Sequence, residues 1–225
     1  ARNSAREGAS TSLLQHTVDV PFGAHAIDRQ RQLFSRVFGY PVPQTPAEFG
    51  IEVESAESPP VCMLAHGTTW ASKHWPEPMW IALSRGLSER GYQVYLPAGN
   101  DVEAQRAQRI AAAGHAKVLP QMDLEALIDK LSNAGLVIGV DSGLSHLAAA
   151  LGRPTITLYG STDPLLTGAR GVRAINLQPQ FRCSPCGSRV CSYRGDDRFW
   201  QQQVVAPACF SELTPERVLQ AVEAL

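Results

Sequence analysis

The sequence predicts an α/β fold built around a parallel, doubly wound sheet. From residue 61 onward, short apolar runs alternate with longer segments whose apolar residues recur at helical spacing. The short runs are nearly continuously apolar, which is typical of strands buried on both faces. Regular alternation of strand and helix favours parallel strands that are joined by helical crossovers.

Each element follows from its own local pattern. The predicted strands are VCMLAH (61–66), YQVYLP (92–97), AKVLP (116–120), LVIGV (136–140) and PTITLYG (154–160). The predicted helices in this part of the chain cover residues 77–91, 101–114, 123–135, 142–152 and 214–225. Asp123 and Thr214 are the expected N-caps of two of these helices, because their side-chain oxygens can accept from the first backbone N–H groups. Pro76 and Pro215 suit the first helical turn, where a missing N–H costs nothing.

The first 60 residues have a different character. The segment AIDRQRQLFSRVFGY (26–40) has apolar residues at helical spacing, and the proline-rich YPVPQTPAEFG (40–50) reads as a linker. No apolar run approaches the roughly 20 residues of a membrane helix, and the N-terminal stretch has no apolar signal-peptide core. We therefore expect neither feature.

Composition excludes some classes of function. The chain has 225 residues, 44% hydrophobic and 18% charged, with a net charge of −1, as expected for a soluble globular enzyme. This charge balance gives no electrostatic reason to expect a nucleic-acid partner. Neither a G-x-G-x-x-G motif nor a Walker A motif is present, so neither NAD binding nor ATP hydrolysis is indicated.

The candidate site residues follow the predicted strands, because ligands of open α/β sheets bind at the carboxyl ends of the strands. The first strand is followed by HGTTWASKHW, in which two hydroxyls (Thr68, Thr69) and Lys73 suit a phosphate group. A capping threonine and a surface lysine are the alternative. Glu103, after the second strand, suits ribose hydroxyls, or else it simply favours a helix N-terminus. Met122, after the third strand, suits a base ring, or else it is a core methionine.

The fourth predicted strand ends in Asp141-Ser142-Gly143 at the start of a helix. Unpaired N–H groups at a helix start attract anions, and Gly143 permits a close backbone approach. Asp141 is the wrong charge for an anion, so we expect it to bind a hydroxyl or an ammonium, and His146 lies one turn further on. The alternative makes Asp141 the N-cap and His146 a core histidine. Taken together, the four strand ends predict a site for a nucleotide that carries a diphosphate.

Five cysteines leave several possibilities open. Cys62 lies in an apolar run and is expected to be buried. The other four have the spacing C-x2-C-x4-C-x17-C, namely Cys183, Cys186, Cys191 and Cys209. Zinc ligands, disulfides and free thiols are all compatible with this pattern.

Three quoted segments resemble one family over residues 3 to 225. HGTTWASKHWP, LPAGNDVEAQRAQRI and VLPQMDLEALIDKLSNAGLVIGVDSGLSHLAAALGRPTITLYGSTDP are similar to the lipopolysaccharide heptosyltransferases, and KHWP and LPQMDL favour type I over type II. The resemblance implies a GT-B architecture of two Rossmann-like domains. Residues 1–58 would be the remnant of the N-terminal acceptor domain and a linker. Residues 59–225 would be the C-terminal donor domain, with a cysteine-containing insertion at 181–210.

The resemblance also implies roles for the candidate residues. Thr68, Thr69 and Lys73 would hold the diphosphate of ADP-L-glycero-D-manno-heptose, and Lys73 would stabilise the leaving group. Glu103 would bind the ribose and Met122 the adenine. The sugar would be bound by Asp141, with three residues of the following turn beside the sugar and the diphosphate: Ser142, Gly143 and His146.

The implied reaction is an inverting transfer of heptose to Kdo of Kdo2-lipid A, without a metal or other cofactor. It implies a monomer on the cytoplasmic face of the inner membrane. The family's catalytic base lies in early N-terminal units that no residue here matches, so we expect this chain to bind donor rather than to complete the transfer. Type II enzymes, other ADP-sugar transferases and a non-catalytic donor-binding module are the alternatives. Arg6 and Arg36 are candidate contacts for an anionic acceptor, or else surface charges.

Overall fold

The computed structural model describes residue 14, residues 16–51 and residues 60–225. The described residues form two compact units, one made of those up to Glu48 together with Leu165–Thr167, the other of the remainder. The domain boundary predicted at residue 58 lies outside the described residues. In the first unit, α1 (Ala26–Phe38) confirms the predicted N-terminal helix. Gly39 ends this helix in the left-handed region, with φ of 71°.

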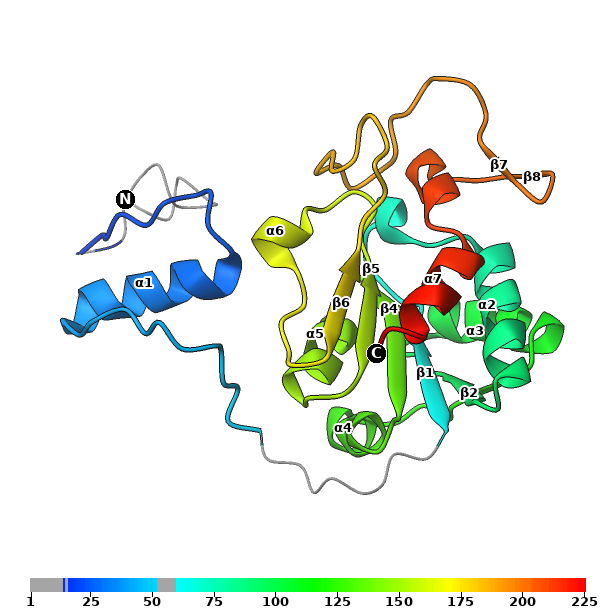
Figure 1. The fold of residues 1–225 in the computed structure, drawn as a ribbon, viewed down its shortest axis with the longest axis horizontal. Helices are drawn as coiled ribbons and strands as arrows, with labels where there is room; N and C mark the ends of the chain where they lie inside the picture. The colour runs from blue at the N-terminus through cyan, green and yellow to red at the C-terminus, as the bar shows by residue number, and fades with distance from the viewer. Residues whose placement is uncertain (1–13, 15, 52–59) are drawn as a thin grey trace. The chain divides into compact units, whose positions relative to one another are not determined.

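The second unit contains a parallel six-stranded sheet, which confirms the predicted fold class. Its strands are β1 (Val61–Ala65), β2 (Gln93–Leu96), β3 (Ala116–Val118), β4 (Leu136–Val140), β5 (Thr155–Leu158) and β6 (Ala174–Leu177). Their order in the sheet is β3-β2-β1-β4-β5-β6 (Figure 1). This is the Rossmann order. All six strands are parallel, but the order in which the chain adds strands reverses between β1 and β4, and sheets of this kind bind ligands in a crevice at that point.

Helices cover both faces of the sheet, as the continuous apolar strands require (Figure 1). Alternate residues of a strand point to opposite faces, so Leu64 packs in one core while Met63 packs in the other. The larger core lies under α2 (Glu77–Glu89), α3 (Asp101–Ala113) and α7 (Pro215–Val222). The smaller core lies under α4 (Leu124–Ser132) and α5 (Gly143–Ala150).

Helix termini follow the predicted signals closely. Asp123 caps α4 and accepts a hydrogen bond from the N–H of Ala126 at 2.8 Å. Thr214 caps α7, with Pro215 in its first turn. Pro76 differs slightly from the prediction, because it occupies the N-cap position of α2 rather than the first helical residue.

Several elements were not predicted. The short helix η2 (Ala71–Lys73) follows β1, α6 (Pro164–Thr167) follows β5, and η3 (Ala208–Glu212) precedes α7. Strand β6 was also missed, as was the hairpin of β7 (Phe199–Trp200) and β8 (Gln203–Val204). Among the described residues, no helix combines the length and apolar character needed to cross a bilayer.

Candidate functional site

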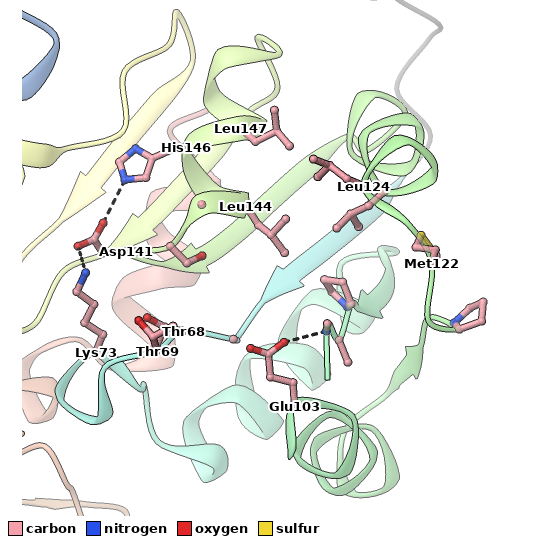
Figure 2. Close-up of a pocket in the computed structure, with 18 residues that line it drawn as sticks. Thr68, Thr69, Lys73, Glu103, Met122, Leu124, Asp141, Leu144, His146 and Leu147 are labelled. Atoms are coloured by element: carbon pink, nitrogen blue, oxygen red, sulfur yellow. Dashed lines mark hydrogen bonds and ion pairs between the residues drawn. The ribbon is translucent and has the colours of Figure 1, made fainter. Parts of the chain in front are cut away.

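One cavity of about 670 Å³ collects all nine predicted site residues. It lies at the carboxyl ends of β1 to β4, and Figure 2 shows the side chains that line it. The nine residues come from four separate segments of the chain: Thr68, Thr69, Lys73, Glu103, Met122, Asp141, Ser142, Gly143 and His146. The sheet topology therefore brings them together where the strand order reverses. The sequence predicted this meeting, because all nine residues follow predicted strands.

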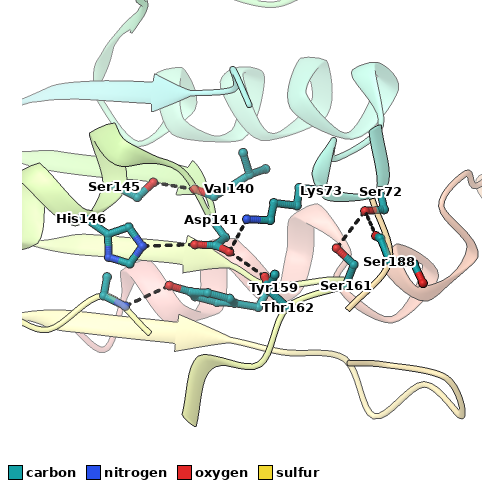
Figure 3. Close-up of polar contacts among 11 residues, drawn as sticks. Ser72, Lys73, Val140, Asp141, Ser145, His146, Tyr159, Ser161, Thr162 and Ser188 are labelled. Atoms are coloured by element: carbon teal, nitrogen blue, oxygen red, sulfur yellow. Dashed lines mark hydrogen bonds and ion pairs between the residues drawn. The ribbon is translucent and has the colours of Figure 1, made fainter. Parts of the chain in front are cut away.

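The polar end of the cavity is organised around Asp141 (Figure 3). Its Oδ2 atom lies 2.7 Å from Lys73 Nζ and accepts a hydrogen bond from the hydroxyl of Thr162, also at 2.7 Å. Its Oδ1 atom lies 3.1 Å from His146 Nε2. A carboxylate has about four acceptor sites, so one remains for a further donor. Lys73 and Asp141, which sequence reasoning assigned to different ligand groups, thus form an ion pair.

These contacts keep Asp141 ionised although its side chain is only 7% exposed. Burial by itself raises the pKa of Asp141. Hydrogen bonds with His146, Lys73 and Thr162 together outweigh burial and lower the pKa to about 2. Asp141 is therefore a pure acceptor at neutral pH, suited to hydroxyl or ammonium donors.

Glu103, on α3, also lines the cavity (Figure 2). Its Oε2 atom accepts a hydrogen bond from the N–H of Gly99 at 2.9 Å, and its own N–H donates to the capping Asn100 side chain at 3.0 Å. The carboxylate also lies against Gly67, where an added Cβ would be 2.6 Å from Oε1. Gly67 is thus required for the position of the Glu103 carboxylate rather than for a special backbone angle.

The opposite end of the cavity is apolar. Met122 lies there beside side chains that sequence reasoning missed, namely Leu124, Leu127, Leu144 and Leu147 (Figure 2). The helical spacing of the two leucine pairs predicted amphipathic helices, but that pattern does not distinguish a core face from a cavity wall. The cavity is consequently polarised, with ionised groups at one end and aliphatic groups at the other.

The turn after β4 contradicts the alternative in which Asp141 is the N-cap and His146 a core histidine. Ser142, not Asp141, is the N-cap of α5, and its hydroxyl makes no capping hydrogen bond. Asp141 is instead oriented toward Lys73, His146 and Thr162 (Figure 3). His146 is not a core histidine, because its side chain is 40% exposed. The alternative of an N-cap aspartate and a core histidine is therefore wrong, and the binding roles of both residues stay predictions.

Sequence reasoning also missed a polar residue, Thr162. It follows β5, in the segment YGSTDP, and its hydroxyl donates to Asp141. Extending the search from four strand ends to the fifth would have found it. Of the two candidate acceptor contacts, Arg6 lies outside the described residues, while Arg36 donates from its guanidinium to the backbone carbonyl of Asp19.

The cysteines are all free thiols, and Cys62 is buried as predicted. Burial raises the pKa of Cys209 to about 12, with a further contribution from the other three cysteines of the insertion. Within the described part of the chain, no three His, Cys, Asp or Glu side chains are grouped so that they could hold a metal ion.

A family model described as glycosyltransferase family 9 (heptosyltransferase) matches residues 1–195, which is most of the chain. The chain belongs to glycosyltransferase family 9. Lipopolysaccharide heptosyltransferase 1 of Pseudomonas aeruginosa is 38% identical to this family 9 chain over 232 residues. The match covers 100% of the chain and 65% of that protein. Lipopolysaccharide heptosyltransferase 2 of Escherichia coli is less similar, at 29% identity over 184 residues, covering 76% of the chain and 48% of that protein.

Solved structures of the family agree with this assignment. The E. coli heptosyltransferase WaaC with ADP has a TM-score of 0.74 and 31% identity. It covers 99% of this chain, which in turn covers 63% of that protein. WaaC with ADP-2-deoxy-2-fluoro heptose has a TM-score of 0.71. The family 9 chain therefore spans just under two thirds of the length of these relatives.

Proposed function

We propose that this chain binds ADP-L-glycero-D-manno-heptose and serves its transfer to lipopolysaccharide. The observation that carries the proposal is the polarised cavity, in which a lysine and a helix start lie at one end and apolar side chains at the other. Membership in family 9 and the ADP and ADP-heptose analogue bound by the related WaaC support the same ligand class.

Each part of the donor has a matching part of the cavity. The adenine would contact Met122 and the leucines of the apolar end, and the ribose hydroxyls would donate to Glu103. The diphosphate would be held by Thr68, Thr69 and Lys73, together with the N–H groups at the start of α5. An ammonium has three N–H donors, so Lys73 can keep its contact with Asp141 and still donate to a phosphate oxygen.

The heptose would lie at the acidic end of the cavity. Asp141 has one acceptor site left beside its three contacts, which suits one sugar hydroxyl. Ser142, Gly143 and His146 would line the same position. Asp141 would thus recognise the sugar while Lys73 recognises the diphosphate, although the two side chains form an ion pair.

In the proposed reaction an acceptor hydroxyl oxygen attacks the anomeric carbon of heptose. The bond from that carbon to the diphosphate oxygen breaks, and ADP leaves with the electron pair. Lys73 and the N–H groups at the start of α5 would stabilise the charge that develops on the leaving diphosphate. The hydroxyl proton would pass to a base, for which no residue of this chain is assigned.

Binding is the direct test, because it does not depend on that base. Calorimetry with ADP-heptose, ADP and UDP should show binding of both adenine ligands and much weaker binding of UDP, whose smaller base would leave the apolar end unfilled. Magnesium-free buffer is used throughout. Equal affinity for ADP and UDP would contradict the assignment of the adenine, and no binding of ADP would overturn the proposed function.

The acceptor is proposed to be Kdo of Kdo2-lipid A. The higher identity to the type 1 enzyme, compared with the type 2 enzyme, supports this choice. We further propose action as a monomer at the cytoplasmic face of the inner membrane, where such a lipid acceptor would be reached. The test is transfer by the natural protein that contains this chain, with Kdo2-lipid A and with the already heptosylated lipid. A preference for the heptosylated lipid would indicate a type 2 enzyme instead.

A further inference from the structure

The cysteine-containing insertion contacts the short helix that carries Lys73. The backbone N–H of Ser72 donates to the carbonyl of Arg189 at 3.1 Å, and the Ser72 hydroxyl donates to the carbonyl of Ser188 at 2.5 Å. Ser72 is 1% exposed, so both bonds are shielded from water. The residue directly before Lys73 is therefore fixed by the segment 188–189, more than a hundred positions away in the sequence.

The same segment is attached to the end of β5. The N–H of Gly187 donates to the carbonyl of Ser161 at 2.7 Å, and the Ser184 hydroxyl donates to the carbonyl of Gly160 at 2.6 Å. The Ser161 hydroxyl, itself buried, lies 2.9 Å from that of Ser72. Three stretches of chain thus meet beneath Lys73: η2, the end of β5 and residues 184–189.

These contacts complete a ring of residues that includes the ion pair (Figure 3). Ser72 contacts Ser161, whose neighbour Thr162 donates to Asp141 at 2.7 Å. Asp141 contacts Lys73 at 2.7 Å, and Lys73 is bonded through the backbone to Ser72. All five residues contribute a side chain to this ring, and backbone bonds join Ser161 to Thr162 and Ser72 to Lys73.

The insertion also contacts Trp70, whose ring lies beside Lys73. The Lys73 ammonium lies 4.5 Å from the centre of the Trp70 ring, and the Arg189 guanidinium lies 5.5 Å from the same ring. Both distances fall within the range of cation–π attraction. Lys73, with a side chain only 16% exposed, is therefore restrained on its aromatic side as well as on its acidic side.

We propose that Ser72, held by Ser161 and by the 184–189 segment, is a positioning residue for Lys73. The inference rests on the proposed function, since it assumes that Lys73 binds the diphosphate. It assigns a role to the insertion, because the 184–189 backbone supplies the acceptors that fix Ser72. A lysine without such support would sample many rotamers, and each restraint lowers the entropy lost when the ligand binds.

Calorimetric titration with ADP tests the proposal on the full chain. Ser72→Ala should weaken ADP binding about fivefold, which corresponds to about 1 kcal/mol for one net hydrogen bond. Ser161→Ala, which keeps the bond from Ser72 to Ser188, should cause a smaller loss in the same direction. Ser132→Ala is the matched control, because Ser132 is also buried and donates to a backbone carbonyl, at 2.8 Å, outside the cavity lining.

The decisive readout is the effect of Ser72→Ala in a Lys73→Met background. If Ser72 acts through Lys73, Ser72→Ala should change ADP affinity by less than about twofold once Lys73 is already Met. The reason is that two substitutions acting through the same contact do not have additive effects. A fivefold loss in that background would overturn the positioning role, as would unchanged ADP affinity in Ser72→Ala alone. Failure of the unaltered chain to bind ADP would instead overturn the proposed function together with this inference.

Discussion

Replacing Lys73 by Met tests the polar end of the cavity while it keeps the apolar stem of the side chain. The change removes the ammonium that lies 2.7 Å from Asp141, and with it one hydrogen-bond donor of the proposed diphosphate site. Hydrogen bonds to charged groups contribute about 1.5–3 kcal/mol. We therefore expect ADP to bind about 10- to 150-fold more weakly.

The same variant should change how stability depends on pH. The pKa of Asp141 is lowered to about 2 in the folded chain, so its contribution to stability is fully present above about pH 4 and is lost as the pH falls toward 2. That contribution amounts to about 2 kcal/mol at 1.36 kcal/mol per unit. Without Lys73, the pKa of Asp141 rises and this loss becomes smaller, which urea unfolding between pH 2 and pH 5 measures.

Calorimetry with ADP and with adenosine separates the local effect from general damage. Adenosine lacks the diphosphate, so its affinity should not change in Lys73→Met. The exposed Lys130 provides a matched control, since Lys130→Met leaves the cavity lining intact. Equal losses for ADP and adenosine would refute the assignment of Lys73 to the diphosphate, and so would an undiminished affinity for ADP.

Two other perturbations address separate parts of the site, and a third addresses the buried His66 that follows β1. Asp141→Asn keeps an acceptor oxygen for Lys73, so it should leave ADP affinity within about twofold. It removes the negative charge, so it should weaken ADP-heptose by about tenfold, the scale of one charged hydrogen bond; equal losses by calorimetry would count against a sugar contact. Gly67→Ala should displace the Glu103 carboxylate and weaken ADP several-fold while sparing 2′,3′-dideoxy-ADP, and a loss common to both nucleotides would contradict a ribose contact. Burial, together with Arg106, lowers the pKa of the fully buried His66 to about 4, so stability should decrease by about 3 kcal/mol as the pH falls from 6.5 to 4. Urea unfolding at several pH values should show that the free energy of unfolding depends less steeply on pH in His66→Asn than in the unaltered chain. Equal dependence on pH in the two proteins would contradict a lowered pKa of His66.

Much of the fold could be predicted because the strands are buried on both faces. LVIGV is apolar at every position, and the helix starts at Asp123 and Thr214 carry side-chain caps. Strand β6 escaped prediction because AINL is short, contains a polar Asn176 and is only half-buried at the edge of the sheet. The β7–β8 hairpin has strands of two residues, too short for any periodicity.

The candidate site was predictable to the extent that strand ends define it. All nine candidate residues line one cavity, because parallel strands deliver their following loops to the same edge. Contacts between side chains from distant segments were not predictable. The pairing of Lys73 with Asp141 and the bond from Ser72 to Ser188 depend on backbone positions that no local pattern encodes.

The polarity of the cavity determines the orientation in which a ligand can bind. A molecule that entered end for end would set its phosphates against Leu124 and Leu127 and its aromatic ring against an ionised carboxylate. Its phosphates would lose the donors of Lys73 and of the start of α5, so the reversed pose is disfavoured. The cavity therefore favours one orientation of its ligand. A synthetic inhibitor would need an aromatic group at one end and an anionic group at the other, separated by the distance from Met122 to Lys73.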